Sequence, residues 1–275
     1  WTCWLIEVLL IMKIESIDIN VNKVVNIAID AGKEILRIYQ QDSFNQQSKL
    51  DKSPLTEADI AAHNLITRQL KQITPNVPIL SEESKKIAWD VRKLWSVYWL
   101  IDPLDGTKEF IKKNGEFTVN IALIYQNDPI IGVVHAPVLN ETWVGEQGKS
   151  AIKIEQGSIT IIKTTPYKKT DICKVVGSRS HAGDSLNKFL QGLGKYQLMS
   201  IGSSIKFCLV AEGKAHIYPR LGLTSEWDTA AAHAVVNSAG GEVFDFETKI
   251  PLKYNTKDSL LNPYFVVQDK SSMFL

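Results

Sequence analysis

Apolar residues recur every three or four positions between residues 21 and 40, the spacing that lines one face of an α-helix. These positions are Val24, Ile27, Ala28, Ala31 and Ile35. A second helix is predicted to begin after Thr56, a typical N-cap residue, and to end before Pro75. The first quarter of the chain is therefore predicted to contribute two amphipathic helices.

Uninterrupted apolar runs predict buried strands further along the chain. Residues 97–101 form the first such run, and it is expected to stop at Asp102 because Pro103 cannot continue a central strand. Strands are also expected over 117–125, 130–135 and 142–144. From residue 172 strands and helices alternate, with strands expected at 172–176, 197–201, 215–218, 242–246 and 265–268 and helices at 185–193, 204–211 and 229–238. Such alternation predicts a layered α/β protein.

The chain is expected to divide into two halves. A stretch rich in Lys, Thr and Gly over about residues 145–170 is the predicted junction, which places the halves at 12–150 and 151–275. Residues 1–11 are apolar but too short to cross a bilayer, and they lack the basic start and cleavage site of a signal peptide. We therefore expect residues 1–11 to be an extension outside the fold.

Composition limits the classes of function. With 275 residues and 44% hydrophobic content, the chain can bury one large core or two modest ones. Its net charge of +1 argues against nonspecific binding of nucleic acid or membranes as the main role. The three cysteines form no CxxC pair, so neither a zinc knuckle nor a disulfide framework is indicated, and a reducing compartment is expected.

The best candidate for chemistry follows the apolar run at 97–101. Asp102 and Asp105 lie three residues apart across a tight turn, where two carboxylates repel unless a hard divalent cation binds between them. The Leu104 carbonyl is a plausible further ligand. Gly106 lets the backbone approach an anion, and Thr107 offers a hydroxyl group. The alternative is an ordinary surface turn.

Three other carboxylates are candidates, and each has a structural alternative. Glu82 ends another short apolar run, but with Glu83 beside it the segment could be a solvated acidic loop. Asp59 closes a capping box with Thr56 at the start of the second helix. Asp228 opens the helix expected at 229–238, where the helix dipole favours a carboxylate.

Four blocks occur in the order found in a known family. They are PLTEAD at 54–59, SEE at 81–83, WLIDPLDGT at 99–107 and WDTAA at 227–231. Over about residues 20–268 the chain resembles the lithium-sensitive, magnesium-dependent inositol monophosphatase superfamily. Within it, the chain is most similar to the CysQ-type 3'(2'),5'-bisphosphate nucleotidases. The signals for that type are KEFI at 108–111, GSRSH at 177–181, GSSIKFC at 202–208, AEGKA at 211–215 and YPR at 218–220.

The resemblance implies a five-layer αβαβα sandwich and a Mg²⁺-dependent hydrolase with two or three ions, inhibited by Li⁺. The implied reaction removes the 3'-phosphate from 3'-phosphoadenosine 5'-phosphate, a by-product of sulfate assimilation, by attack of a metal-activated water. The implied metal ligands are Glu82, Asp102, Asp105, Asp228 and the Leu104 carbonyl. The implied catalytic residues are Asp59, Glu82 and Thr107. The implied substrate contacts are Gly106, Thr107, His181, Ser203, Lys206, Arg220 and Asp228.

Several alternatives stay open. The same metal core would serve an inositol monophosphatase or another sugar-phosphate phosphatase, and an inactive phosphate-ligand binder is a third possibility. Lys206 and Arg220 could be ordinary helix-end and loop charges, and His181 a turn residue. The expected partner is a small nucleotide bisphosphate, with no nucleic acid and no integral membrane association. A monomer or homodimer is expected in the cytoplasm, with a peripheral position at the inner membrane face as an alternative.

Overall fold

Two β-sheets organise the molecule, and the computed structural model describes residues 11–14, 17–41, 46–48, 54–178 and 184–272. The larger sheet has seven strands and is antiparallel except where its last two strands run parallel. In spatial order these strands are β11 (Ser158–Ile161), β10 (Ile152–Glu155), β9 (Glu141–Glu146), β8 (Asp128–Ala136), β7 (Thr118–Tyr125), β6 (Val97–Asp105) and β5 (Ile79–Ser81). The smaller sheet has five, namely β13 (Tyr196–Ile201), β12 (Cys173–Ser178), β14 (Ile217–Arg220), β16 (Phe265–Asp269) and β15 (Gly241–Asp245).

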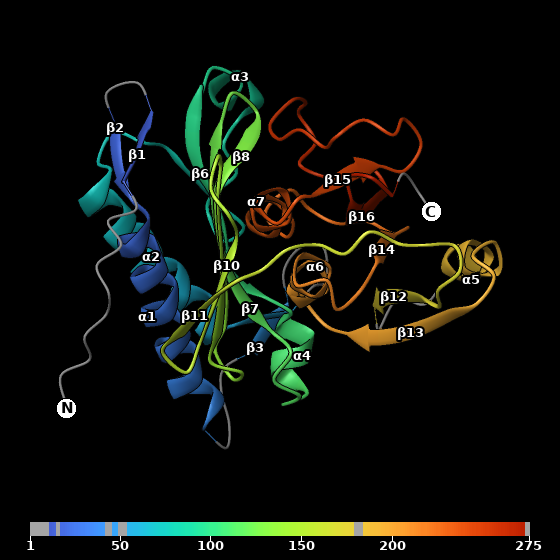
Figure 1. Cartoon of the computed structure of the whole chain (residues 1–275). Coiled ribbons are helices and arrows are strands. Elements are labelled where there is room, and N and C mark those ends of the chain that lie inside the picture. Colours follow the sequence, from blue (N-terminus) through green and yellow to red (C-terminus); the bar gives the residue numbers. More distant parts are fainter. Residues whose placement is uncertain (1–10, 15–16, 42–45, 49–53, 179–183, 273–275) are drawn as a thin grey trace.

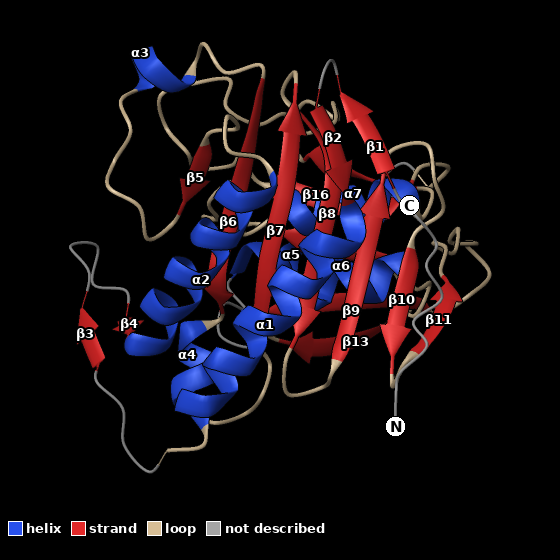
Figure 2. Cartoon of the chain, turned by 90° about the vertical axis from the view of Figure 1, so that its left-hand side faces the viewer, coloured by secondary structure: helices blue, strands red, loops and turns tan. Residues whose placement is uncertain are grey.

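Two helices cover one face of the seven-stranded sheet (Figure 2). They are α1 (Val21–Tyr39) and α2 (Glu57–Ile73), close to the predicted bounds. All five apolar positions that predicted the first helix are buried, and they pack with strand residues such as Trp99 and Ile121 in one hydrophobic core. The apolar residues that predicted this helix from their spacing thus form the face of α1 that packs against the sheet.

The opposite face packs against α7 (Ala230–Ser238), and α6 (Ile205–Ala211) packs against α7 and the smaller sheet, so both helices lie between the two sheets (Figure 1). Close packing of α7 depends on two glycines. A Cβ atom at Gly132 would lie 2.0 Å from the Ala231 carbonyl oxygen, and one at Gly145 would lie 2.3 Å from that of Ala234. Any side chain there would push α7 away from the sheet, and Asp228 directly precedes this helix.

A third helical layer completes the sandwich. Helix α5 (Asp184–Gln191) packs Leu186 and Leu190 against Val175 and Ile217 of the five-stranded sheet. The layers therefore run helix, sheet, helix, sheet, helix, which confirms the predicted αβαβα sandwich (Figure 1). The shorter elements are β1 (Ile11–Ile14), β2 (Ile17–Asn20), β3 (Gln46–Ser48), β4 (Pro54–Thr56), α3 (Trp89–Arg92) and α4 (Thr107–Ile111).

The structure differs from the sequence-based expectation at β6. The strand was expected to stop at Asp102, yet it continues through Pro103 to Asp105. Its pairing with β7 is irregular between Asp102 and Asp105, and β5 pairs with β6 only up to Ile101. Pro103 is tolerated because it falls in this bulge, where no backbone N–H is needed for the ladder.

The region expected to join two halves is part of the large sheet. Residues 152–161 form β10 and β11, which extend that sheet, and the chain reaches the second sheet at Cys173. The division at 150 stays a prediction. The expected extension, residues 1–11, lies outside the described residues except for Ile11, the first residue of β1. Within the described part of the chain, no helix is both long and apolar enough to cross a membrane.

Candidate metal and phosphate site

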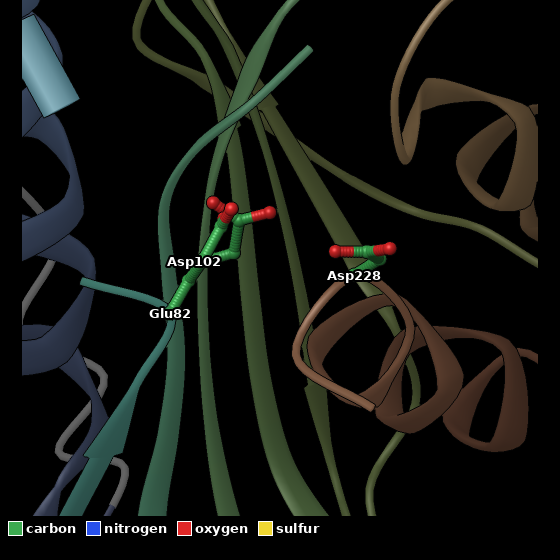
Figure 3. A group of neighbouring side chains, drawn as sticks. All are labelled: Glu82, Asp102 and Asp228. Carbon is green, nitrogen blue, oxygen red and sulfur yellow. The ribbon is translucent and has the colours of Figure 1, made fainter. Parts of the chain in front are cut away.

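Three carboxylates from distant parts of the sequence meet where the end of the large sheet lies near the turn ahead of α7 (Figure 3). Glu82 directly follows β5, where its backbone N–H donates to the Ile101 carbonyl at 3.2 Å. Asp102 lies in β6, and Asp228 faces both from the turn ahead of α7 (Figure 3). One oxygen of each lies within 4.8 Å of the other two, so the group could hold a metal ion.

The electrostatics of this group favour a cation. Burial raises the pKa of Asp102 well above its usual range, and the charges of Glu82, Asp105 and Asp228 raise it further. Burial likewise raises the pKa of Asp228, with contributions from Asp105 and Glu82. Like charges held together in a desolvated place are unfavourable unless they are protonated or a cation binds them. Because every donor is a carboxylate oxygen, the set suits a hard divalent ion.

The bulge in β6 shapes the turn that carries Asp105. The Leu104 backbone N–H donates to Asp102 Oδ1 at 3.0 Å, which orients the Asp102 carboxylate. Gly106 has a φ of +97°, and a Cβ atom there would lie 3.1 Å from the Glu116 carbonyl oxygen. Only glycine takes this conformation readily, so the turn depends on Gly106 for both its shape and its space.

Asp105 lies beside the group of three rather than within it. Its Oδ2 accepts a hydrogen bond from Ser204 Oγ at 2.7 Å. Its charge nevertheless contributes to the raised pKa values of Asp102 and Asp228. The structure thus brings three of the four predicted carboxylate ligands together, and Asp105 borders them.

Asp59 takes part in two sets of interactions. Its Oδ2 accepts hydrogen bonds from the Thr56 backbone N–H at 2.8 Å and from Thr56 Oγ1 at 2.5 Å, which completes the capping box of α2. Its Oδ1 accepts from Thr107 Oγ1 at 3.2 Å. The structural alternative for Asp59 is therefore present, and the same carboxylate also contacts the predicted catalytic threonine.

A cavity of about 120 Å³ is shared by two of the predicted metal ligands and by predicted substrate residues. It is lined by Asp105, Gly106, Ser203, Lys206, Arg220 and Asp228, among others. Lys206 is buried in its wall, and burial lowers the pKa of the ammonium group to about 8. His181 lies outside the described residues, so its predicted role is not placed.

Backbone and side-chain contacts orient the two basic groups. Lys206 Nζ donates to the Ser203 carbonyl oxygen at 2.5 Å and lies 5.5 Å from the centre of the Tyr218 ring. Arg220 Nε donates to Thr224 Oγ1 at 2.9 Å. A buried ammonium group that faces a shared cavity differs from an ordinary solvated helix-end charge, the alternative considered for Lys206.

Sequence reasoning missed the polar residues behind the site. Asn120 and Ser204 are buried and hydrogen-bonded to each other, and Ser204 also contacts Asp105. Glu226 is buried nearby, and burial raises the pKa of its carboxyl group to about 7. One signal was available for Asn120: polar residues at 116, 118 and 120 alternate with apolar ones, just ahead of and at the start of a strand that is otherwise apolar.

Comparisons with known proteins agree on a family. The sequence profile of the Inositol monophosphatase family matches residues 20–271. Over 247 residues the chain is 51% identical to the 3'(2'),5'-bisphosphate nucleotidase CysQ of Escherichia coli, covering 90% of this chain and 98% of that protein. The protein of the same name from Buchnera aphidicola subsp. Acyrthosiphon pisum is 42% identical over 233 residues, covering 81% and 83%.

Solved structures give the same result. CysQ from Bacteroides thetaiotaomicron is described as a bacterial member of the inositol monophosphatase family. It matches with a TM-score of 0.80 and 41% identity, over 91% of this chain and 97% of that one. The extragenic suppressor protein suhB from Bartonella henselae has a TM-score of 0.75 at 22% identity, over 91% and 93% of the two chains, and this likeness concerns the fold alone.

Proposed function

Because this chain belongs to the inositol monophosphatase family, we propose that it is a phosphatase that removes the 3'-phosphate from 3'-phosphoadenosine 5'-phosphate. The observation that carries the proposal is that Asp105 and Asp228 line the same cavity as basic residues. A metal-bound phosphate needs the carboxylates, and a second phosphate on the same nucleotide needs cations a short distance away. Lys206 and Arg220 supply those cations in the same cavity wall.

We propose Mg²⁺ as the metal, in two or three sites, with Li⁺ as an inhibitor. The ligands would be Glu82, Asp102 and Asp228, joined by Asp105 and the Leu104 carbonyl. The residues fit such an ion because they bring only oxygen donors and a surplus of negative charge. When bound, Mg²⁺ would stabilise the developing charge on the phosphate oxygens and lower the pKa of the attacking water.

Two residues of the chain are placed to accept the proton of the attacking water. Thr107 Oγ1 donates to Asp59 Oδ1, so its lone pairs are directed away from Asp59 and can accept a hydrogen bond from water. We propose that Thr107 and Asp59 orient the attacking water, and that Thr107 takes a proton from this water as it passes its own proton to Asp59. Glu82 would help to hold the metal that binds the water. The backbone N–H groups of Gly106 and Thr107 would hold the scissile phosphate. Displacement is then in line, without a covalent enzyme intermediate.

The second phosphate decides the choice of substrate. We propose that Ser203, Lys206 and Arg220 contact the 5'-phosphate and nucleotide, with His181 as a further predicted contact. Inositol 1-phosphate carries one phosphate group only, so it gains nothing from these cations. The proposed specificity for a bisphosphate follows from that difference.

A substrate panel tests the proposal. Hydrolysis of 3'-phosphoadenosine 5'-phosphate, 3'-phosphoadenylyl sulfate and inositol 1-phosphate is measured with Mg²⁺, with and without Li⁺. We expect the nucleotides to have the highest kcat/KM and Li⁺ to inhibit. Equal or better turnover of inositol 1-phosphate would refute the proposed substrate, and binding without turnover of any ester would favour the inactive binder.

A matched pair of variants sharpens this test. Arg220→Ala removes one predicted phosphate contact, whereas Lys253→Ala removes an exposed cation paired with Asp128. We expect Arg220→Ala to raise the KM for 3'-phosphoadenosine 5'-phosphate at least tenfold and to leave the KM for inositol 1-phosphate unchanged. Lys253→Ala should change neither, so an equal effect of Arg220→Ala on both substrates would contradict a second-phosphate role.

We also propose a reducing, cytoplasmic location. Cys173 and Cys208 are buried free thiols, and burial raises the pKa of Cys173 to about 11, which keeps this thiol unreactive. No observation on the described residues supports the alternative of a peripheral membrane position. The choice between monomer and homodimer stays a prediction, which size-exclusion chromatography with light scattering would decide.

A further inference from the structure

A row of polar side chains connects the seven-stranded sheet to the loop that precedes α6. Glu116 Oε2 accepts from the Gly202 backbone N–H at 2.8 Å. The hydroxyl groups of Thr118 and Ser203 lie 2.7 Å apart, and Asn120 Nδ2 donates to Ser204 Oγ at 2.9 Å. Alternate residues in and just ahead of β7 thus contact three consecutive residues of the loop, so the position of the loop follows the register of β7.

These residues stand opposite the predicted metal ligands in the sheet. Asn120 pairs with Asp102 across β6 and β7, and Thr118 pairs with Asp105. Directly opposite residues in an antiparallel pair project from the same face. The row of polar side chains and the acidic residues therefore share one face of the sheet.

Ser204 connects two of the acidic segments. Its Oγ lies 2.7 Å from Asp105 Oδ2 and 2.8 Å from the Asp228 carbonyl oxygen. A hydroxyl group has one proton and two lone pairs. Since Asn120 donates to one lone pair, the hydroxyl proton lies between two acceptors, Asp105 Oδ2 and the Asp228 carbonyl oxygen, which share it. Ser204 is only 1% exposed, so bulk water does not compete for these bonds.

We propose that Ser204, oriented by Asn120, is a positioning residue of the metal site. By sharing its one proton, Ser204 keeps the Asp105 carboxylate at the end of β6 and the Asp228 segment ahead of α7 within hydrogen-bond distance of the same hydroxyl group. The bond from Ser204 takes one lone pair of Asp105 Oδ2 and so fixes the orientation of the carboxylate toward the proposed metal site. This inference rests on the proposed function to the extent that it requires a metal site between these segments. Loss of a hydrogen-bond partner behind a carboxylate ligand typically weakens metal binding roughly 10- to 100-fold.

Calorimetric titration with Mg²⁺ alone tests the inference without substrate. Ser204→Ala should raise the Kd for Mg²⁺ at least tenfold, and Ser204→Thr, which keeps the hydroxyl group, should stay within about threefold of the parent. Ser238→Ala is the matched control, because Ser238 Oγ also bonds a backbone carbonyl, that of Glu146, at 3.1 Å. Its Mg²⁺ affinity should equal that of the parent.

The Mg²⁺ dependence of kcat distinguishes a positioning role of Ser204 from a purely structural one. In Ser204→Ala, raising Mg²⁺ to saturation should restore kcat to within a few fold of the parent, with KM for 3'-phosphoadenosine 5'-phosphate unchanged. A purely structural role would instead lower kcat at every Mg²⁺ concentration. Unchanged Mg²⁺ affinity in Ser204→Ala, or a kcat that excess Mg²⁺ does not restore, would overturn the inference.

A second variant keeps the test decisive if Ser204→Ala fails to fold. Asn120→Leu has a similar volume but removes the donor, so the Kd for Mg²⁺ should rise at least fivefold, and an unchanged Kd would overturn the inference. In the double variant the effects should not add, because both act through one hydroxyl group. If the parent binds no Mg²⁺, the proposed metal chemistry fails as well. If the parent binds it and Ser204→Ala binds equally, only this inference fails.

Discussion

Replacing Asp102 with asparagine should stabilise the metal-free protein while it abolishes Mg²⁺-dependent activity. Asp102 shares its buried position with Glu82 and Asp228, with one oxygen of each within 4.8 Å of the others. At an effective dielectric constant of about 20, two unit charges at that separation repel by about 3 kcal/mol. Asp102→Asn removes this repulsion and keeps an oxygen to accept the hydrogen bond from the Leu104 N–H.

The gain in the free energy of unfolding from Asp102→Asn should increase as pH rises. The pKa of Asp102 in the folded protein is raised above its usual value of 3.8. Stability of the parent therefore falls as pH rises from about 4 through the folded-state pKa, because the unfolded chain releases the proton first. Asparagine does not titrate, so the advantage of Asp102→Asn should be near zero at pH 4 and should grow to about 3 kcal/mol by pH 8.

Urea unfolding in the presence of EDTA at several pH values measures this gain. Asp128→Asn is the matched control, because Asp128 forms an exposed ion pair with Lys253 and should change stability by less than about 1 kcal/mol. Mg²⁺ should raise the melting temperature of the parent but not that of Asp102→Asn. The reasoning is refuted if Asp102→Asn is less stable than the parent at pH 8, or if Mg²⁺ stabilises both equally.

Three further predictions follow from single residues. Gly106→Ala places a side chain at a φ of +97° against the Glu116 carbonyl. It should therefore lower the free energy of unfolding in urea by about 1–3 kcal/mol, and a loss below about 0.5 kcal/mol would contradict this. Thr107→Val should lower kcat by roughly 10²–10⁴ with Mg²⁺ affinity by calorimetry unchanged, whereas a weaker affinity would indicate a metal-binding role. Burial raises the pKa of Glu226 from 4.5 to about 7. The metal-free parent should therefore lose about 3 kcal/mol of stability between pH 4.5 and 7 relative to Glu226→Gln; parallel stability curves for the two proteins would argue against it.

The sequence predicted the elements whose pattern is local. Helix α1 was recognised because its buried face repeats at helical spacing, and α2 because Thr56 and Pro75 mark its ends. The continuation of β6 past Pro103 was missed because the bulge depends on how β7 and β5 pair with it. Strands β10 and β11 were missed because they are short and β11 is wholly exposed, which leaves little hydrophobic signal.

Some features of the candidate site were likewise predictable from the sequence, and others were not. Glu82, Asp102 and Asp228 were recognised from short motifs, and the fold brings them together. The contacts of Ser204 were not predictable, because they require the loop before α6 to lie against a particular strand. Short motifs are therefore enough to recognise the predicted metal ligands. The hydrogen bonds that orient these ligands cannot be read from the sequence, because they form only when distant segments pack together.

The wide spacing of the acidic group along the chain has a consequence for folding kinetics. Asp102 lies in β6 and Glu82 directly follows the neighbouring strand β5, whereas Asp228 joins them from the segment ahead of α7, more than 100 residues later in the chain. Contacts of such long range form late, because closing large loops is entropically costly. A metal ion that binds all three carboxylates would stabilise the native state and leave an early transition state unaffected. Mg²⁺ should therefore slow unfolding far more than it accelerates folding.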